Sequence, residues 1–422
     1  MKSEFSSALV AGLGYIGLPT AAIIASRGIR VTGYDINEDV VEQVSSGNAH
    51  IYETDLDGLV QKVVSSGMLT ATNKPCPADV FIIAVPTPIG EDHAPVTDYV
   101  FDTAKAIAPV LHEGATIILE STSPVGTTEE LSTLLEGLRP DLKFPTNFPE
   151  EPDVAIAYCP ERVLPGRILT EVVENDRCIG GITPRCARKA QSFYKTFVRG
   201  KCITTNARAA ELVKLTENSF RDTNIAFANE LSLICDRFDV NAWEVIELAN
   251  RHPRVNILNP GPGVGGHCIA VDPWFIVHSA PEQARLIRTA REVNDEKIEF
   301  TIERCLKLIE GNADQKIALF GLAFKADIDD LRESPAMEIA SRLVTQYRDR
   351  VRIVEPYLHD LPEQLRNHGA KLAGLDEALR ECGILIVLVD HDVFKLIEPQ
   401  ERMGHAIYDT RGIWRDYNTH AA

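Results

Sequence analysis

The sequence predicts an α/β fold in which two doubly wound parallel-sheet domains are joined by a central helical region that contains one long helix. Short apolar runs of strand length alternate with helical stretches in the first and last parts of the 422-residue chain, as in parallel sheets. Between these parts, residues 207–238 contain neither glycine nor proline and are rich in helix-forming residues. A strand ending in glycine, a strand ending in an acid and an apolar strand follow one another twice, which indicates two Rossmann-like units.

The first domain is predicted for residues 1–205, the central helical region for 206–312 and the last domain for 313–422. Predicted strands of the first domain are 8–11, 31–35, 80–85, 116–119, 154–159 and 178–179, with a helix at 19–27. The central region has predicted helices at 207–238, 242–250 and 283–309, and the last domain has predicted strands at 317–321, 351–355 and 384–389. At about 1.5 Å per residue, the first central helix would be about 48 Å long. A helix of this length usually connects domains or forms the seam of a dimer.

Composition narrows the class of protein. The formal net charge of −18 argues against a nucleic-acid partner, because phosphate backbones are bound by positive surfaces. No apolar run approaches the roughly 18 residues of a membrane span, and the N-terminus resembles neither a signal peptide nor a transit peptide. The nine cysteines are scattered without a C-x-x-C pair, which favours reduced thiols and argues against a zinc ribbon. We therefore expect a cytoplasmic protein without a membrane partner.

A dinucleotide fingerprint follows the first predicted strand. Gly12 permits a tight turn, Gly14 lets a pyrophosphate approach the backbone, and Gly17 lets the helix pack on the strand. Asp35 ends the next strand, where an acid binds ribose hydroxyls and repels the 2′-phosphate of NADP. The candidate cofactor-binding residues here are Gly12, Gly14, Tyr15, Ile16, Gly17 and Asp35, and the expected cofactor is NAD. The alternative is a glycine-rich structural turn.

Three further segments follow predicted strands at the edge where ligands of such sheets bind. Thr87 lies in a Val-Pro-Thr-Pro segment that contributes to the cofactor site or merely terminates a strand. Thr122 lies in a hydroxyl-rich segment that caps the next helix or holds water or the nicotinamide amide. Glu161 could act as a base or hold a water, and Arg162 could clamp an anion; the alternative is an exposed turn with a local ion pair.

The central region carries the most specific stretch. Lys214, Asn218 and Arg221 form one polar stripe on the long helix, either a solvated face or the lining of a pocket. A glycine- and proline-rich loop precedes Cys268, and Asp272 follows four residues later. A cysteine behind such a loop indicates a nucleophile, whereas a cysteine alone is usually inert core. His267 and Cys268 lack the partners of a tetrahedral metal site, so no metal is expected.

Over essentially its whole length, the chain resembles the UDP-glucose/GDP-mannose dehydrogenase family. The resemblance is carried by residues 161–166, 218–222, 262–273 and 324–335. The UDP-glucose branch has a second glutamate where this chain has Pro165, and a lysine where it has Val271. At both positions the chain resembles the acetamido-sugar branch of the family, which counts against UDP-glucose as the substrate.

The resemblance implies an activity and a mechanism. The C6 alcohol of UDP-N-acetyl-D-mannosamine would be oxidised to a carboxylate with reduction of two NAD, supplying bacterial surface polysaccharides such as enterobacterial common antigen. Cys268 would form a thiohemiacetal and then a thioester, and Lys214 would stabilise the oxyanion and exchange protons. By the same resemblance, Asn218 is a second oxyanion donor. The implied organisers of water and protons are Asp272, Thr122 and Glu161.

The resemblance also implies how ligands and subunits are bound. Arg332 would reach the cofactor, and the loop with His252 and Arg254 would reach the neighbouring subunit's site in a homodimer built on the long helix. Phe324 and Lys325 replace the dinucleotide turn in the second unit, which should therefore bind the UDP-sugar. The implied substrate-binding residues are Arg162, Val163, Lys214, Asn218, Arg221, His252, Arg254, Gly263, Gly265, Phe324 and Lys325.

Other functions stay open on the sequence alone. The same chemistry could act on another UDP-sugar such as UDP-N-acetylglucosamine or UDP-glucose. A two-electron dehydrogenase shares the fold but has no use for Cys268. A non-catalytic NAD-binding regulator would keep the fingerprint but has no reason for Lys214, Asn218 and Cys268 together.

Overall fold

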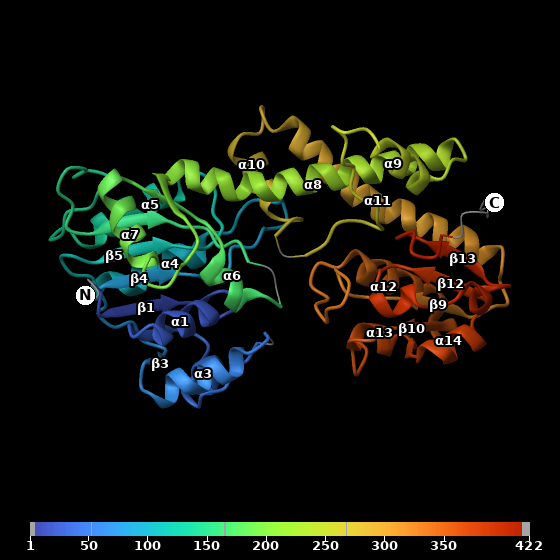
Figure 1. Cartoon of the computed structure of the whole chain (residues 1–422), viewed down its shortest axis with the longest axis horizontal. Coiled ribbons are helices and arrows are strands. Elements are labelled where there is room, and N and C mark those ends of the chain that lie inside the picture. The colour runs from blue at the N-terminus through green and yellow to red at the C-terminus, as the bar shows by residue number, and fades with distance from the viewer. Residues whose placement is uncertain (1–4, 52, 164–165, 267, 416–422) are drawn as a thin grey trace. The chain divides into compact units, whose positions relative to one another are not determined.

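The computed structural model describes residues 5–51, 53–163, 166–266 and 268–415 (Figure 1). The chain forms two compact units. The first comprises the residues up to Glu217 together with Trp274–Pro281, and the second comprises Asn218–Pro273 and the residues from Glu282 onward. Each unit contains one twisted sheet with helices on both faces, so the predicted fold class is confirmed.

The sheet of the first unit has eight strands in the order β3-β2-β1-β4-β5-β6-β7-β8. These strands are β1 Ser7–Ala11, β2 Arg30–Tyr34, β3 Leu69–Thr72, β4 Val80–Ile83, β5 Thr116–Leu119, β6 Ala155–Tyr158, β7 Arg177–Gly181 and β8 Cys202–Asn206. The first six run parallel, whereas β7 is antiparallel to β6 and β8 is parallel to β7. The expectation of a wholly parallel sheet is therefore wrong at this edge. The helix between β6 and β7 has only seven residues, about 10 Å, so the chain enters β7 from the edge at which β6 ends.

Alternate residues of the central strands face two hydrophobic cores. Ala8 and Val10 of β1 pack against one helix layer, and Leu9 and Ala11 pack against the other. The helices of the first layer are α1 Gly17–Ser26, α2 Glu38–Ser45, α3 Leu56–Ser65, α6 Ile168–Glu174 and α7 Pro184–Tyr194. The second layer consists of α4 Asp98–Ile107 and α5 Thr127–Leu138. Burial on both faces explains why these strands are continuous apolar runs.

The long helix α8 spans Ala207–Arg237, close to the prediction, and is about 46 Å long. Its first residues, up to Glu217, belong to the first unit and the rest to the second. In the second unit it is followed by α9 Ala242–Ala249 and α11 Arg285–Glu310. The short helix α10, Asp272–Ser279, was not predicted.

The sheet of the second unit has five parallel strands in the order β11-β10-β9-β12-β13. These are β9 Ile317–Phe320, β10 Val351–Val354, β11 Lys371–Leu372, β12 Ile384–Val387 and β13 Ala406–Asp409. One face packs against α11, α12 Pro335–Tyr347 and α13 Glu363–Asn367, and the other against α14 Leu375–Glu381 and α15 Asp392–Lys395. The point where the strand order reverses, between β9 and β12, is where ligands bind in such sheets.

The sequence missed strands β3, β8, β11 and β13, which lie at or beside sheet edges and have short or partly polar sequences. The predicted domain limits at 205/206 and 312/313 stay predictions. None of the helices in the described part of the chain combines the length and apolar character needed to cross a membrane.

Candidate active site

The glycine turn after β1 has the geometry that a dinucleotide requires. Gly12 has φ +87°, and its N–H donates to the carbonyl of Tyr34 at 2.8 Å. A Cβ at Gly17 would lie 1.7 Å from the carbonyl oxygen of Gly12, so only glycine fits there. A Cβ at Gly14 would meet nothing within 4 Å, which leaves the space that a pyrophosphate needs. Tyr15 and Ile16 complete the turn and are at least partly exposed.

Asp35 lies just after β2 and touches this turn. Its carboxylate accepts N–H groups from Leu13 at 2.8 Å and from Asn37 at 2.9 Å. Each carboxylate oxygen keeps further acceptor capacity, so Asp35 can still bind ribose hydroxyls. The residues around the turn therefore fit NAD.

Thr87 and Thr122 follow β4 and β5. Thr87 is buried and Thr122 is half-buried, and neither hydroxyl caps a helix. The N-terminus of α5 is capped instead by Glu211 of α8, whose carboxylate accepts the N–H of Gly126 at 2.7 Å and of Thr128 at 2.8 Å. The alternative of a hydroxyl cap from the 120–127 segment is therefore wrong, and the sequence carried no local signal for Glu211.

Glu161 lies in a buried ion pair rather than on an exposed turn. One oxygen of its carboxylate is 2.5 Å from Nη1 of Arg177, which is 1% exposed, and the other accepts the N–H of Arg162 at 2.6 Å. The Arg162 side chain pairs with Glu217 at 2.6 Å. The exposed-turn alternative is therefore wrong, and Arg177, which no sequence pattern indicated, orients Glu161.

Glu120 is a second buried carboxyl beside this pair. Tyr194 donates its hydroxyl to Oε1 of Glu120 at 2.6 Å, whereas Oε2 is buried with no hydrogen-bond partner among the described residues. Burial and the charge of Glu161 raise the pKa of Glu120 to about 7, although Arg177 and Tyr194 lower it. The only sequence signal for this group is an acid directly after an apolar strand.

In the second unit, Asn218 and Asp272 come together. Asn218 donates to the carboxylate of Asp272 at 2.5 Å, and both side chains are buried. The N–H of Asp272 donates to the carbonyl of Cys268 at 2.9 Å, so Cys268 is fixed one turn before α10 with an exposed side chain. Lys214 precedes Asn218 by one helical turn on α8, within the first unit, and is half-buried.

Buried amides anchor the start of the glycine loop. The N–H of Gly261 donates to Oδ1 of Asn229 at 2.9 Å, and Asn229 donates to Asn294 at 2.9 Å. Asn294 in turn donates to Asp222 at 2.8 Å, and Asp222 is paired with Arg291 at 2.7 Å. The loop is therefore tied to both α8 and α11.

The end of the glycine loop lies against the segment that follows β9. Gly266 donates its N–H to the carbonyl of Glu333 at 3.2 Å, and a Cβ at Gly266 would lie 2.9 Å from the Phe324 ring. A Cβ at Gly265 would lie 2.2 Å from the same carbonyl oxygen of Glu333, and one at Gly263 would touch Pro335 at 3.0 Å. The predicted substrate residues Gly263, Gly265 and Phe324 are therefore neighbours.

The remaining predicted residues are less constrained. Arg332 pairs with Asp330 at 2.6 Å, and Val163 packs on the core of the first sheet. Exposed predicted residues are Arg221, His252, Arg254 and Lys325. His267 and Pro165 lie outside the described residues. Within the described ranges, no three His, Cys, Asp or Glu side chains group as a metal site would require.

The first sheet, its glycine turn and Asp35 define a dinucleotide-binding domain of the dehydrogenase class. Models of the UDP-glucose/GDP-mannose dehydrogenase family match the chain three times: the NAD binding domain at residues 7–198, the central domain at 208–296 and the UDP binding domain at 318–416. The chain belongs to this family. It is an NAD-dependent enzyme that oxidises UDP-sugars, so the predicted family, cofactor and enzyme class are confirmed.

Relatives cover nearly the whole chain. An NDP-N-acetyl-D-galactosaminuronic acid dehydrogenase of Ralstonia nicotianae is 56% identical over 97% of this chain and 97% of its own. A UDP-N-acetyl-D-mannosamine dehydrogenase of Escherichia coli is 55% identical over 98% of this chain and 100% of its own. The solved structure of a UDP-D-ManNAc dehydrogenase from Pyrococcus horikoshii superposes with a TM-score of 0.85 at 38% identity, covering 97% of this chain and 96% of its own.

Replacing the buried Glu120 by glutamine should change how stability depends on pH. Between pH 4.5 and about 7 the unfolded chain releases the Glu120 proton while the folded protein keeps it, so wild-type stability falls as pH rises. Glu120→Gln lacks this loss and should gain on wild type by up to about 3 kcal/mol across that window. Thermal unfolding at pH 5 and pH 8 measures the difference. The exposed Glu130→Gln is the control, and equal shifts in both variants would contradict the assignment.

Proposed function

We propose that the enzyme oxidises the C6 alcohol of UDP-N-acetyl-D-mannosamine to the carboxylate and that the product supplies a bacterial surface polysaccharide such as enterobacterial common antigen. The observation that carries the proposed chemistry is Cys268, exposed behind a glycine loop and hydrogen-bonded through its backbone to Asp272, which Asn218 holds. A two-electron dehydrogenase has no use for such a cysteine. The sugar itself is proposed from the acetamido-type departures at Pro165 and Val271 and from the names of the relatives.

NAD, when bound at the glycine turn, supplies the hydride acceptor for both oxidation steps. The chain's own residues bind and orient the substrate. Lys325 and Arg162 are proposed to hold the diphosphate of the substrate. Phe324 is proposed to contact the base or the ribose, and Gly263 and Gly265 the sugar that is oxidised. Further proposed contacts come from Val163, Arg221, His252 and Arg254, and Arg332 is proposed to reach the cofactor.

Cys268 is proposed to make the second oxidation possible. Its thiolate attacks the C6 aldehyde, forming a C–S bond and an oxyanion that Lys214 and Asn218 stabilise. Loss of a hydride from this tetrahedral carbon leaves a thioester. A water held by Asp272, Glu161 and Thr122 then attacks the thioester and the C–S bond breaks, which forms the uronate, restores the thiolate and releases both protons of the water.

The sugar is the least constrained part of the proposal. The two relatives are 56% and 55% identical but carry the names of different acetamido-hexose derivatives, so identity alone does not choose between them. The two sugars differ in the orientation of ring substituents, which pocket shape must read. UDP-N-acetylglucosamine and UDP-glucose are also candidate substrates.

Turnover of a panel of UDP-sugars tests the substrate. We expect UDP-N-acetyl-D-mannosamine to have the highest kcat/KM and to yield two NADH per sugar, because the oxidation removes four electrons. The panel contains the N-acetylmannosamine, N-acetylgalactosamine, N-acetylglucosamine and glucose derivatives. If another UDP-sugar of the panel has a higher kcat/KM, that sugar is the substrate instead. A yield of one NADH per sugar would contradict the four-electron reaction. Comparable efficiency with NADP would contradict the role given to Asp35.

Removing the Cys268 thiol tests the mechanism. Cys268→Ala should reduce uronate formation on the order of a thousandfold or more, because the second oxidation loses its nucleophile. Cys268→Ser, a weaker nucleophile, should stop at a bound hemiacetal or ester that mass spectrometry detects. Binding of NAD and UDP should persist in both. Cys76→Ala is the control, and near wild-type uronate production by Cys268→Ala would end this mechanism.

A homodimer built on α8 is also proposed. Four large apolar side chains on α8 and just after it are strongly exposed: Phe220 68%, Phe227 54%, Ile234 46% and Phe238 72%. Phe220, Phe227 and Ile234 are seven residues apart and lie on one face of α8, as in helix–helix seams, and Phe238 follows directly after the helix. A second copy of this chain is the occupant we propose, and the loop with His252 and Arg254 would then serve the partner's site.

A cytoplasmic location of the enzyme stays a prediction.

Charging this face should separate the subunits. Phe227→Glu should shift the protein from dimer to monomer in light scattering and lower activity in parallel, because a carboxylate would be buried in the seam. Glu230→Gln, an exposed change on the same helix, is the control. A wild-type protein that is monomeric and active at assay concentration would refute the dimer. If Arg254→Ala and Cys268→Ala chains exchange without restoring activity, the sites are not shared.

A further inference from the structure

A short loop after β9 carries two of the proposed UDP-sugar residues. It runs from Leu322 to Asp327 and includes Phe324 and the exposed Lys325. Three further acids follow closely in sequence, Asp329, Asp330 and Glu333, so the segment is acidic apart from Lys325 and Arg332. Acidic side chains repel a diphosphate, so the usefulness of Lys325 depends on how the loop is held.

The start of the loop is held by Glu355, directly after β10. One carboxylate oxygen of Glu355 accepts the N–H groups of Leu322 at 2.7 Å and Ala323 at 3.2 Å, and the other accepts the N–H of Tyr357 at 3.2 Å. Glu355 is 3% exposed. Burial raises its pKa, but hydrogen bonds from His391 and Leu322 outweigh burial and hold the pKa below its usual value. Glu355 is therefore an anion fully engaged inside the protein.

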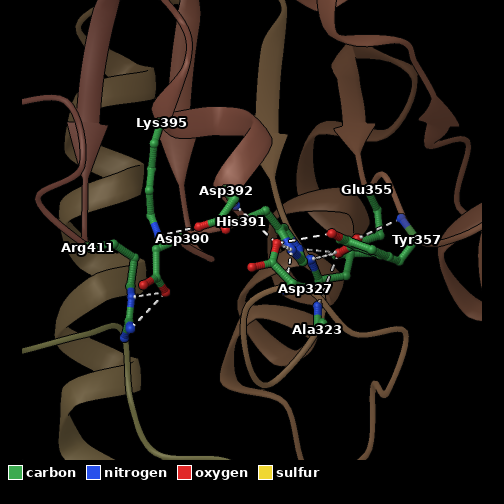
Figure 2. Close-up of polar contacts among 10 residues, drawn as sticks. Ala323, Asp327, Glu355, Tyr357, Asp390, His391, Asp392, Lys395 and Arg411 are labelled. Atoms are coloured by element: carbon green, nitrogen blue, oxygen red, sulfur yellow. Dashed lines mark hydrogen bonds and ion pairs between the residues drawn. The ribbon is translucent and has the colours of Figure 1, made fainter. Parts of the chain in front are cut away.

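The end of the loop is held by His391, which follows β12 and is completely buried. The N–H of Asp327 donates to Nδ1 of His391 at 2.9 Å, so Nδ1 is an acceptor and the ring proton resides on Nε2. Nε2 lies 3.2 Å from the carboxylate of Glu355 and donates to it. Figure 2 shows that this one pair connects both ends of the loop.

The side chain of Asp327, the first acid of the loop, is also held by neighbouring residues. Asp327 has φ +61°, and its carboxylate accepts the hydroxyl of Tyr357 at 3.1 Å and the N–H of Asp392 at 3.0 Å (Figure 2). These two donors stabilise the charged form of the Asp327 carboxylate and hold it in place, whereas Lys325, two residues earlier, is exposed. Loss of the His391 contact would release the backbone of Asp327.

We propose that Glu355 and His391 are positioning residues for the UDP moiety, which act by fixing the Leu322–Asp327 loop so that Lys325 faces the diphosphate. The inference rests on the proposed role of Lys325. Neither side chain touches the ligand. The carboxylate of Glu355 is occupied by hydrogen bonds from within the protein, and the His391 ring is completely buried. The pair is therefore expected to set UDP affinity without taking part in hydride or thiol chemistry.

Calorimetric binding of UDP and steady-state kinetics test this on the full-length enzyme. His391→Leu removes both ring contacts and should weaken UDP binding and raise the KM for UDP-sugar about tenfold, the effect of losing one to two buried hydrogen bonds. The kcat and the KM for NAD should stay within about twofold. His391→Gln keeps an amide donor and acceptor and should recover part of the affinity. His405→Leu, which loses a contact with the carbonyl of Leu379 in the same unit, is the matched control.

Unchanged UDP affinity in a folded His391→Leu enzyme would overturn the inference, and so would an equal loss for UDP and NAD, which indicates general damage. If that variant does not fold, Glu355→Gln takes its place with the same expectation for UDP and the same overturning result. Lys325→Ala separates the two claims. If Lys325→Ala binds UDP normally, the proposed role of Lys325 is wrong; if it binds weakly while His391→Leu binds normally, only the positioning role is wrong.

Discussion

A hydrogen bond that the turn after one strand donates to a carboxylate at the end of the neighbouring strand organises both halves of this enzyme. In the first unit Asp35 accepts the N–H of Leu13, and in the second Glu355 accepts the N–H of Leu322. Each donating leucine follows a glycine with positive φ, Gly12 at +87° and Gly321 at +92°. A buried or half-buried N–H that lost this acceptor would cost about 1–3 kcal/mol, so the turn and the acid specify one another.

Two buried acids at the carboxyl edge of the first sheet, Glu161 and Glu120, lie in different electrostatic surroundings. Glu161 is paired with the buried Arg177, whereas burial and the neighbouring Glu161 raise the pKa of Glu120 to about 7. The arrangement explains why Arg177 can begin a strand and yet be 1% exposed.

The sequence predicted the fold class, the long helix to within one residue at its end, and the glycine turn with its acid. These features are local, because periodicity, composition and turn chemistry act over a few residues. The sequence did not reveal the pairing of Asn218 with Asp272, the burial of Glu161 against Arg177, or the cap that Glu211 gives to α5. Each joins residues far apart in the chain, so only the packed structure brings them together. The reversed direction of β7 and β8 was missed for the same reason, since nothing within a strand's own sequence distinguishes the two directions.

The two sheets also match beyond their acids. Val80 of β4 pairs with Ala8 of β1, and Ile384 of β12 pairs with Ile317 of β9, so the fourth residue after each strand is Thr87 in one unit and His391 in the other. In the first unit this position offers a small hydroxyl at the ligand edge. In the second it is occupied by a completely buried imidazole that accepts the N–H of Asp327 and donates to Glu355. The two units thus share one architecture but differ at an equivalent position. The small side chain leaves space for a ligand, whereas the large side chain fills the same space with protein.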